Sequence, residues 1–147
     1  MSKVKQDQNA ATEEKLRNLI VQVRMLESMV TELQTRIEMV DATINEYSIT
    51  GMTLDGLKGM KEGTEILVPV GGGSYLKAKM GNVEDVIFNI GAGVTVEQKK
   101  AEAKLSVENR ISELKKLRTN FDEQLGAALS KMDKTREEIG KITGVKE

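Results

Sequence analysis

The chain is 147 residues long, about the size of one ordinary domain, and it carries 31% charged but only 3% aromatic residues at a formal net charge of −1. So little aromatic area beside so much charge indicates long exposed helices rather than a compact core, and the near-neutral balance argues against a nucleic-acid-binding protein. The sequence holds no Cys and no His, which excludes a disulfide framework and removes the usual general base and the commonest metal ligand.

The first predicted element is a long helix over residues 8–50 with the pattern of a coiled coil. From Leu16 onward an apolar residue recurs at alternating spacings of three and four, without a gap over five heptads. The series consists of Leu16, Leu19, Val23, Leu26, Val30, Leu33, Ile37, Val40, Ile44 and Tyr47. Gly51 follows directly, and a glycine there predicts the end of the helix.

Over residues 51–94 the hydrophobic period changes from 3.5 to 2, which predicts strands. Short apolar runs joined by three-residue glycine turns are typical of β-hairpins, and here they predict two. The runs are residues 65–70, 74–80, 85–90 and 94–96, with turns at 71–73 and 91–93. Pro69 cannot donate to a ladder, so we expect its strand to lie at a sheet edge or to be irregular there. The glycines at 71–73 lack the Gly-Lys-Ser/Thr of a phosphate loop, which argues against nucleotide binding.

A second long helix is predicted over residues 95–143, opening at Thr95 with the pattern of a capping box. Its apolar stripe is weaker than the first, because Arg118 and Thr135 interrupt it and Ala128 is small. Two helices of similar length around a small β segment are expected to fold back antiparallel and bury their stripes on each other.

These elements predict an α+β fold, mainly α: an antiparallel two-helix coiled-coil arm with two β-hairpins inserted, forming one domain over residues 1–147. An isolated hairpin is marginal in water, and an apolar face with open edges favours pairing with other chains. We therefore expect closure into an oligomeric β-barrel. The predicted oligomerisation residues are Ile66, Val68, Val70, Leu76, Met80, Val86, Phe88 and Ile90.

Three segments of the β region carry a family resemblance. They are Glu65-Ile-Leu-Val-Pro-Val-Gly-Gly-Gly-Ser74, Tyr75-Leu-Lys-Ala-Lys79 and Val86-Ile-Phe-Asn-Ile-Gly-Ala-Gly-Val-Thr-Val-Glu97. They resemble prefoldin, a jellyfish-shaped chaperone, and two hairpins between the helices are typical of its α-type subunit, here with an archaeal composition. The resemblance implies a hexamer of two α-type and four β-type subunits on a double β-barrel. It also implies ATP-independent holding of unfolded polypeptides at the arm tips and their delivery to a group II chaperonin, with no cofactor.

The apolar residues near the two chain ends have two interpretations. They are first of all seam residues of the coiled coil; alternatively, fraying of the helix ends exposes them to an unfolded client. The candidate client-binding residues are Val4, Leu16, Leu19, Ile20, Met132, Ile139, Ile142 and Val145. Met25, Met29 and Met39 also lie off the seam; they fit helix filler better than a promiscuous surface, although flexible Met suits both.

The remaining expectations concern location and function class. Residues 1–12 are polar and lack the apolar stretch of a secretory signal, and the longest apolar run, Ile66–Val70, is far too short to span a membrane. The sequence therefore predicts a cytoplasmic protein without membrane or nucleic-acid partners. The main alternative to a chaperone is a structural or filament-forming coiled-coil protein of the same architecture. An enzyme is a distant third hypothesis, because the chain lacks His, Cys and a pocket-forming core.

Overall fold

A computed structural model describes residues 2–144 of the chain. Its elements follow the order α1 (Ser2–Gly56), β1 (Glu65–Gly71), β2 (Ser74–Lys79), β3 (Asp85–Gly91), β4 (Val94–Lys99) and α2 (Lys100–Thr143). The chain divides into two compact units. The terminal unit contains residues up to Asp41 and from Lys116 onward, and the hairpin unit contains residues 42–115. The predicted fold class, two long helices with two antiparallel hairpins between them, is confirmed.

In the terminal unit, α1 and α2 pair along their apolar stripes. Leu26 and Val30 of α1 form a buried cluster with Ala128 and Met132 of α2, and Val23 and Leu125 pack against it. Leu33, Ile37 and Val40 continue the buried stripe of α1. Full burial of an aliphatic side chain of this size contributes about 1.5–3 kcal/mol, so this seam is a main source of stability for the described part of the terminal unit.

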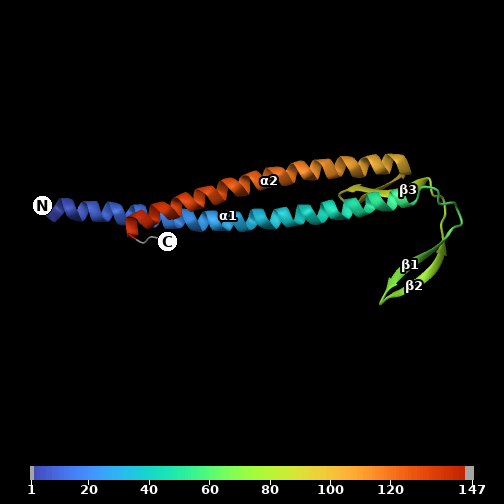
Figure 1. Ribbon diagram of the computed structural model, residues 1–147, viewed down its shortest axis with the longest axis horizontal. Helices are drawn as coiled ribbons and strands as arrows, with labels where there is room; N and C mark the ends of the chain where they lie inside the picture. Colours follow the sequence, from blue (N-terminus) through green and yellow to red (C-terminus); the bar gives the residue numbers. More distant parts are fainter. Residues whose placement is uncertain (1, 145–147) are drawn as a thin grey trace. The chain divides into compact units, whose positions relative to one another are not determined.

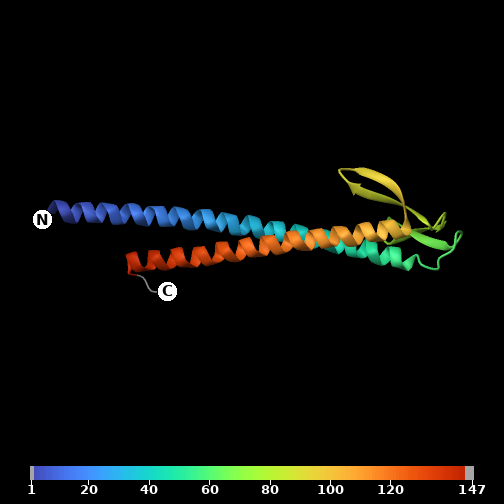
Figure 2. The ribbon, with the colours of Figure 1, turned by 90° about the horizontal axis from the view of Figure 1, so that it is seen from above.

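Ion pairs in the terminal unit show that α1 and α2 run in opposite directions. Arg136 donates to Glu27 at 2.9 Å, and Arg118 donates to Asp41. A later residue of α1 thus pairs with an earlier residue of α2, as an antiparallel pair requires. The two helices lie side by side in both views (Figures 1 and 2).

The hairpin unit has a core of its own, formed by the last turns of α1 and the first turns of α2. Leu54 of α1 and Ala103 and Val107 of α2 are buried there, and Val107 is only 1% exposed. Partly buried apolar residues from both helices, from the turn after α1 and from β3 pack against this cluster. They are Tyr47, Leu57, Val86, Phe88 and Ile111.

The prediction that α1 ends at Gly51 is wrong, since the helix continues to Gly56. Gly51 is buried, and a Cβ there would lie 3.5 Å from Cγ1 of Val107. The glycine therefore marks a close approach of α2 rather than a helix stop. Asp55, one turn further on, accepts a hydrogen bond from Lys104 Nζ at 2.6 Å, which ties the last turn of α1 to α2.

The four strands form two separate antiparallel hairpins rather than one sheet. β1 pairs with β2 and β3 with β4, and in each the register shifts just before the turn, between Pro69 and Gly71 and between Asn89 and Gly91. The expected irregularity at Pro69 is confirmed. All three turn glycines, 71–73, have positive φ, a backbone conformation that glycine adopts without strain.

The predicted start of the second helix at Thr95 is also wrong. Val96 pairs with Phe88 and Gln98 with Val86, so residues 94–99 are the return strand β4 and α2 begins at Lys100. The residues of the capping pattern at Thr95 form a strand instead of a helix start, because pairing with β3 lets one face of the hairpin pack against the helices. The first helix also starts earlier than predicted: α1 begins at Ser2, six residues before residue 8.

Candidate functional site

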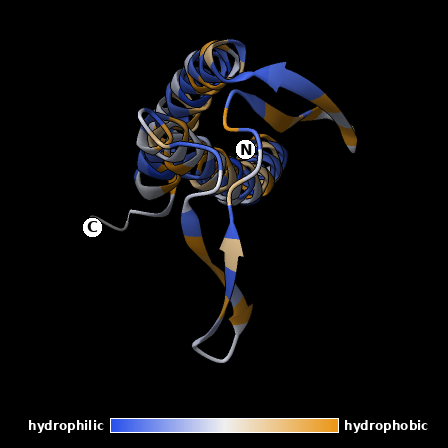
Figure 3. Ribbon diagram, turned by 90° about the vertical axis from the view of Figure 1, so that its right-hand side faces the viewer, coloured by the Kyte–Doolittle hydropathy of each residue, from blue (hydrophilic) through white to orange (hydrophobic). Residues whose placement is uncertain are grey.

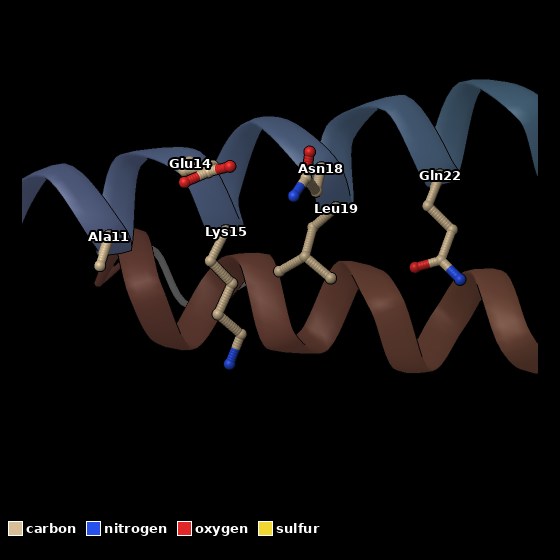
Figure 4. A pocket seen from close by; sticks show the side chains of 6 residues that line it. All are labelled: Ala11, Glu14, Lys15, Asn18, Leu19 and Gln22. Atoms are coloured by element: carbon tan, nitrogen blue, oxygen red, sulfur yellow. The ribbon is translucent and has the colours of Figure 1, made fainter.

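The start of α1 has no helix beside it among the residues that the structure describes. Side chains from Ser2 to Lys15 are exposed without exception. The start of this stretch lies beyond the end of α2 (Figures 1 and 2), and α2 runs beside it from Ala11 onward (Figure 4). Leu16 and Leu19 are the first half-buried residues of α1. Leu16 and Leu19 therefore mark the point from which α1 is partly covered. We call the first part of α1, up to Gln22, together with the end of α2 the open end.

A groove of about 320 Å³ lies at the open end. It is lined by one side of α1: Ala11, Glu14, Lys15, Asn18, Leu19 and Gln22. Leu19 points toward α2, with Lys15 before it and Gln22 after it along the helix (Figure 4). The groove thus combines an apolar centre with long, flexible polar side chains at its margins, a chemistry that suits apolar side chains of varied shape rather than one defined ligand.

The structure brings together several of the candidate client-binding residues. Leu16, Leu19, Ile139 and Ile142 are half-buried in the terminal unit, and Ile20 is exposed beside them. Val4 is 62% exposed on the unpaired part of α1. Val145 lies outside the described residues.

Met132 does not fit the client-binding prediction. It is only 8% exposed and packs in the buried cluster with Leu26, Val30 and Ala128. The seam interpretation holds for this residue, because the cluster already covers the side chain that a client would have to reach.

Sequence reasoning did not find the groove residues Ala11, Lys15, Asn18 and Gln22. Lys15 and Gln22 lie at the heptad position next to the apolar stripe, and Ala11 and Asn18 lie one position further around the helix, so none attracts attention alone. The usable signal was their spacing around Leu19, since residues three and four apart share a helix face.

The two polar interruptions of the second stripe have different structural explanations. Thr135 is 5% exposed and donates its hydroxyl hydrogen to the carbonyl oxygen of Lys131 at 2.7 Å, so the polar group is satisfied within α2. Arg118 leaves the stripe and binds Asp41 with two donors, Nε at 2.5 Å and Nη2 at 3.1 Å, and it also donates to Asp122. Its hydrogen bonds hold the pKa of the Asp41 carboxyl below the ordinary value, with the guanidinium charge adding to the effect.

This lowered pKa gives a pH dependence with a definite sign. The stabilisation from the Asp41–Arg118 pair is fully present above the ordinary Asp pKa of about 3.9 and is lost as the pH falls through the lower pKa of the folded state. We expect the melting temperature of Arg118→Leu to fall less steeply than that of the wild type below about pH 4, as followed by circular dichroism. Arg110→Leu removes an arginine whose partner, Glu113, lies on the same helix, and it should keep the wild-type slope. Equal slopes for Arg118→Leu and wild type would contradict the pair's contribution.

The hairpins expose a second surface. On β1 and β2 the cross-strand pairs Ile66 with Ala78 and Val68 with Leu76 share one face. Val68 and Leu76 are exposed, while Ile66 and Ala78 are half-buried. Figure 3 shows apolar residues, in orange, along both hairpins. An apolar face of this kind on an open two-stranded sheet is typical of a surface that another chain covers.

The predicted oligomerisation residues fall into two groups. Val70 and Ile90 lie beside the turns and are exposed, like Val68 and Leu76, and the half-buried Met80 extends the first ladder through backbone hydrogen bonds with Gly63 and Thr64. Val86 and Phe88 instead pack against the helix cluster of their own chain, which occupies part of their apolar area. Two further exposed apolar residues, Leu67 and the 82% exposed Ile87, lie on the opposite faces of the hairpins, away from the predicted assembly residues.

The described part of the chain, residues 2–144, offers neither a metal site nor a membrane-spanning helix. This part of the chain holds no group of three or more His, Cys, Asp or Glu side chains that could bind a metal ion. None of its helices is long and apolar enough to cross a membrane.

Comparison with known proteins identifies the family. The family model described as prefoldin subunit matches residues 26–144. The chain belongs to the prefoldin family. Prefoldin subunit alpha of Methanosarcina mazei is 33% identical over 84% of this chain and 86% of its own length. That of Methanopyrus kandleri is 32% identical over 77% and 72%, respectively. These names confirm the resemblance to α-type prefoldin subunits.

A solved prefoldin structure supports the same assignment. The chain has a TM-score of 0.69 and 26% identity to filamentous PFD from Methanocaldococcus jannaschii, covering 80% of this chain and 97% of that one. Membership of the prefoldin family makes the protein a chaperone subunit. Its paired helices and its two hairpins, which carry the open end and the exposed hairpin face, are the elements of the prefoldin fold.

Proposed function

We propose that this chaperone subunit holds non-native polypeptides at the open end of its helix pair, without ATP. The observation that carries the proposal is the groove around Leu19, which presents an apolar centre next to a helix stretch whose side chains are all exposed. Unfolded chains expose apolar side chains of many shapes. A shallow groove with flexible margins at Lys15 and Gln22 can accept them without requiring one shape.

A single groove of this kind binds weakly, so the proposal includes several copies in one assembly. Linked weak sites raise overall affinity by about 10²–10⁴-fold, because after the first contact the others are made within one complex. We propose that the apolar hairpin face formed by Ile66, Val68, Leu76 and Ala78 joins this chain to β-type prefoldin subunits, two α-type with four β-type. A cytoplasmic group II chaperonin is the proposed acceptor of the held polypeptide, on the strength of the family resemblance alone.

The structure from M. jannaschii supports a second candidate, because the prefoldin in it is filamentous. In that case the same hairpin face would join copies of this chain into an open fibre that serves as a structural element. Electron microscopy of the purified chain, with and without a β-type subunit, separates closed particles from fibres. A client assay on either form separates a chaperone from an inert scaffold.

The test of the proposed function is suppression of aggregation of an unfolded client in the absence of nucleotide. We expect the wild-type assembly to suppress it and Leu19→Asp to weaken that protection roughly tenfold, because a charge replaces the apolar centre of the groove. Ile49→Asp places the same charge at an exposed apolar residue of the hairpin unit and should protect as well as the wild type. If Leu19→Asp assembles normally and protects the client fully, the groove is not the binding site.

A further inference from the structure

The methionines of α1 are unusually accessible. The chain has eight methionines, and Met25, Met29, Met39 and Met52 of α1 all have exposed side chains. Met25 is 68% and Met29 is 51% exposed, whereas Met132 on α2 is 8% exposed in the buried seam. A large apolar side chain left this accessible does not contribute its full burial energy to the fold, so helix packing does not explain the choice of Met at these positions.

Two of the four continue one side of the groove. Met25 follows Asn18, and Met29 follows Gln22, by seven residues each, and Asn18 and Gln22 both line the groove. A spacing of seven returns to the same side of a coiled-coil helix about 10 Å further along its axis. The side of α1 that lines the groove therefore continues into two exposed, flexible and polarisable thioethers, which add apolar area next to Leu19. Met39 and Met52 lie further along the helix, two and nearly four heptads from Met25.

An exposed thioether is also a site of chemical modification. With hydrogen peroxide, the sulfur lone pair attacks one peroxide oxygen, an S–O bond forms, the O–O bond breaks and water leaves. The sulfur is oxidised to the sulfoxide and the peroxide is reduced. The product is polar where the thioether was apolar, and methionine sulfoxide reductases restore the thioether. At Met25 and Met29 this reaction would make an apolar extension of the groove polar without touching the seam.

We propose that Met25 and Met29 form a peroxide-sensitive part of the polypeptide-binding surface, so that their oxidation releases or weakens bound clients. The regulatory half of this inference rests on the proposed function, since it requires that the open end holds clients. The modification itself does not, because it depends only on the exposure of the two sulfur atoms.

The experiment treats the assembled full-length protein with hydrogen peroxide and follows oxygen uptake at each methionine by peptide mass spectrometry. We expect Met25 and Met29 to oxidise roughly tenfold faster than Met132. Aggregation suppression is measured on the same samples, and we expect it to weaken roughly tenfold once both are oxidised. The variant Met25→Leu/Met29→Leu has no sulfur at these positions, so peroxide treatment should leave its client protection at the level measured for the same variant before treatment. The matched control Met39→Leu/Met52→Leu should stay as sensitive as the wild type.

Two results would overturn the inference. One is wild-type protein that holds clients undiminished while mass spectrometry shows Met25 and Met29 oxidised; this leaves the proposed function standing. The other is equal loss of protection in wild type and Met25→Leu/Met29→Leu, which would place the sensitive group elsewhere. Failure of the untreated wild type to hold any client is a different outcome, since it refutes the proposed function and the regulatory inference with it.

Discussion

The double variant Val68→Asp/Leu76→Asp should leave a folded helix pair that no longer assembles. The two residues are cross-strand partners on the exposed face of the first hairpin. Covering each aliphatic side chain in an interface contributes about 2 kcal/mol, so losing both weakens association roughly a thousandfold, before the cost of desolvating two carboxylates. Neither residue belongs to a buried cluster of the chain, so the helical circular dichroism signal should be unchanged.

Native mass spectrometry or light scattering of the purified variant measures this effect directly. The matched control is Leu67→Asp, which places the same charge on the same strand but on the opposite face of the hairpin, opposite Lys77. We expect this control to assemble. Assembly of the double variant at the wild-type stoichiometry would show that the face formed by Val68 and Leu76 is not the one that joins subunits.

Val107→Asp should have the largest effect on the fold itself. Val107 is the largest fully buried side chain among the residues described. It forms one buried cluster with Leu54 and Ala103, and Phe88 of β3 packs against this cluster. Burying an unpaired carboxylate there costs more than about 4 kcal/mol, a large part of the 5–15 kcal/mol that stabilises a typical domain. We expect the melting transition of the hairpin unit to be lost or shifted far down in temperature.

Leu105→Asp is the control for this substitution. Leu105 lies two residues away on α2 and is exposed, so the same loss of apolar area and the same charge should change the free energy of unfolding by less than about 1 kcal/mol. Thermal denaturation of both variants by circular dichroism compares them. Similar melting temperatures for the two would mean that the cluster around Val107 contributes little to stability.

The sequence pattern predicted the helices and hairpins because their periods are local and strong. The unbroken stripe from Leu16 to Tyr47 required a helical partner, and the alternating runs around two glycine turns required strands. Helix ends were harder to predict. Gly51 is the residue type that often ends a helix, but here it is buried against Val107. Only the three-dimensional packing shows that continuing the helix buries Leu54 in the same cluster. Thr95 and Gln98 have the spacing of a helix cap, but their segment pairs with β3 instead.

The candidate site was only partly predictable for a related reason. Heptads show that Leu19 and Met132 both face a partner helix, but not how well each is covered. Met132 lies inside a four-residue cluster, whereas Leu19 lies near the end of α2 and stays half-exposed. Likewise, alternation placed Val86 and Phe88 with Val68 and Leu76 as assembly residues, but it could not show that the second hairpin packs against its own helices.

Three ion pairs between the helices close loops of different length, and from these lengths we expect an order of folding. They join residues 49, 77 and 109 positions apart, for Lys104 with Asp55, Arg118 with Asp41 and Arg136 with Glu27. Closing a longer loop costs more chain entropy, so the shortest closure forms first and each one shortens the next. Native-state amide hydrogen exchange should therefore be slowest around Val107 and fastest toward Leu19, and uniform protection along α1 would contradict this order. The helix pair would then zip from the hairpins toward the chain ends, and the segment that carries the groove would be the last to close and the first to reopen.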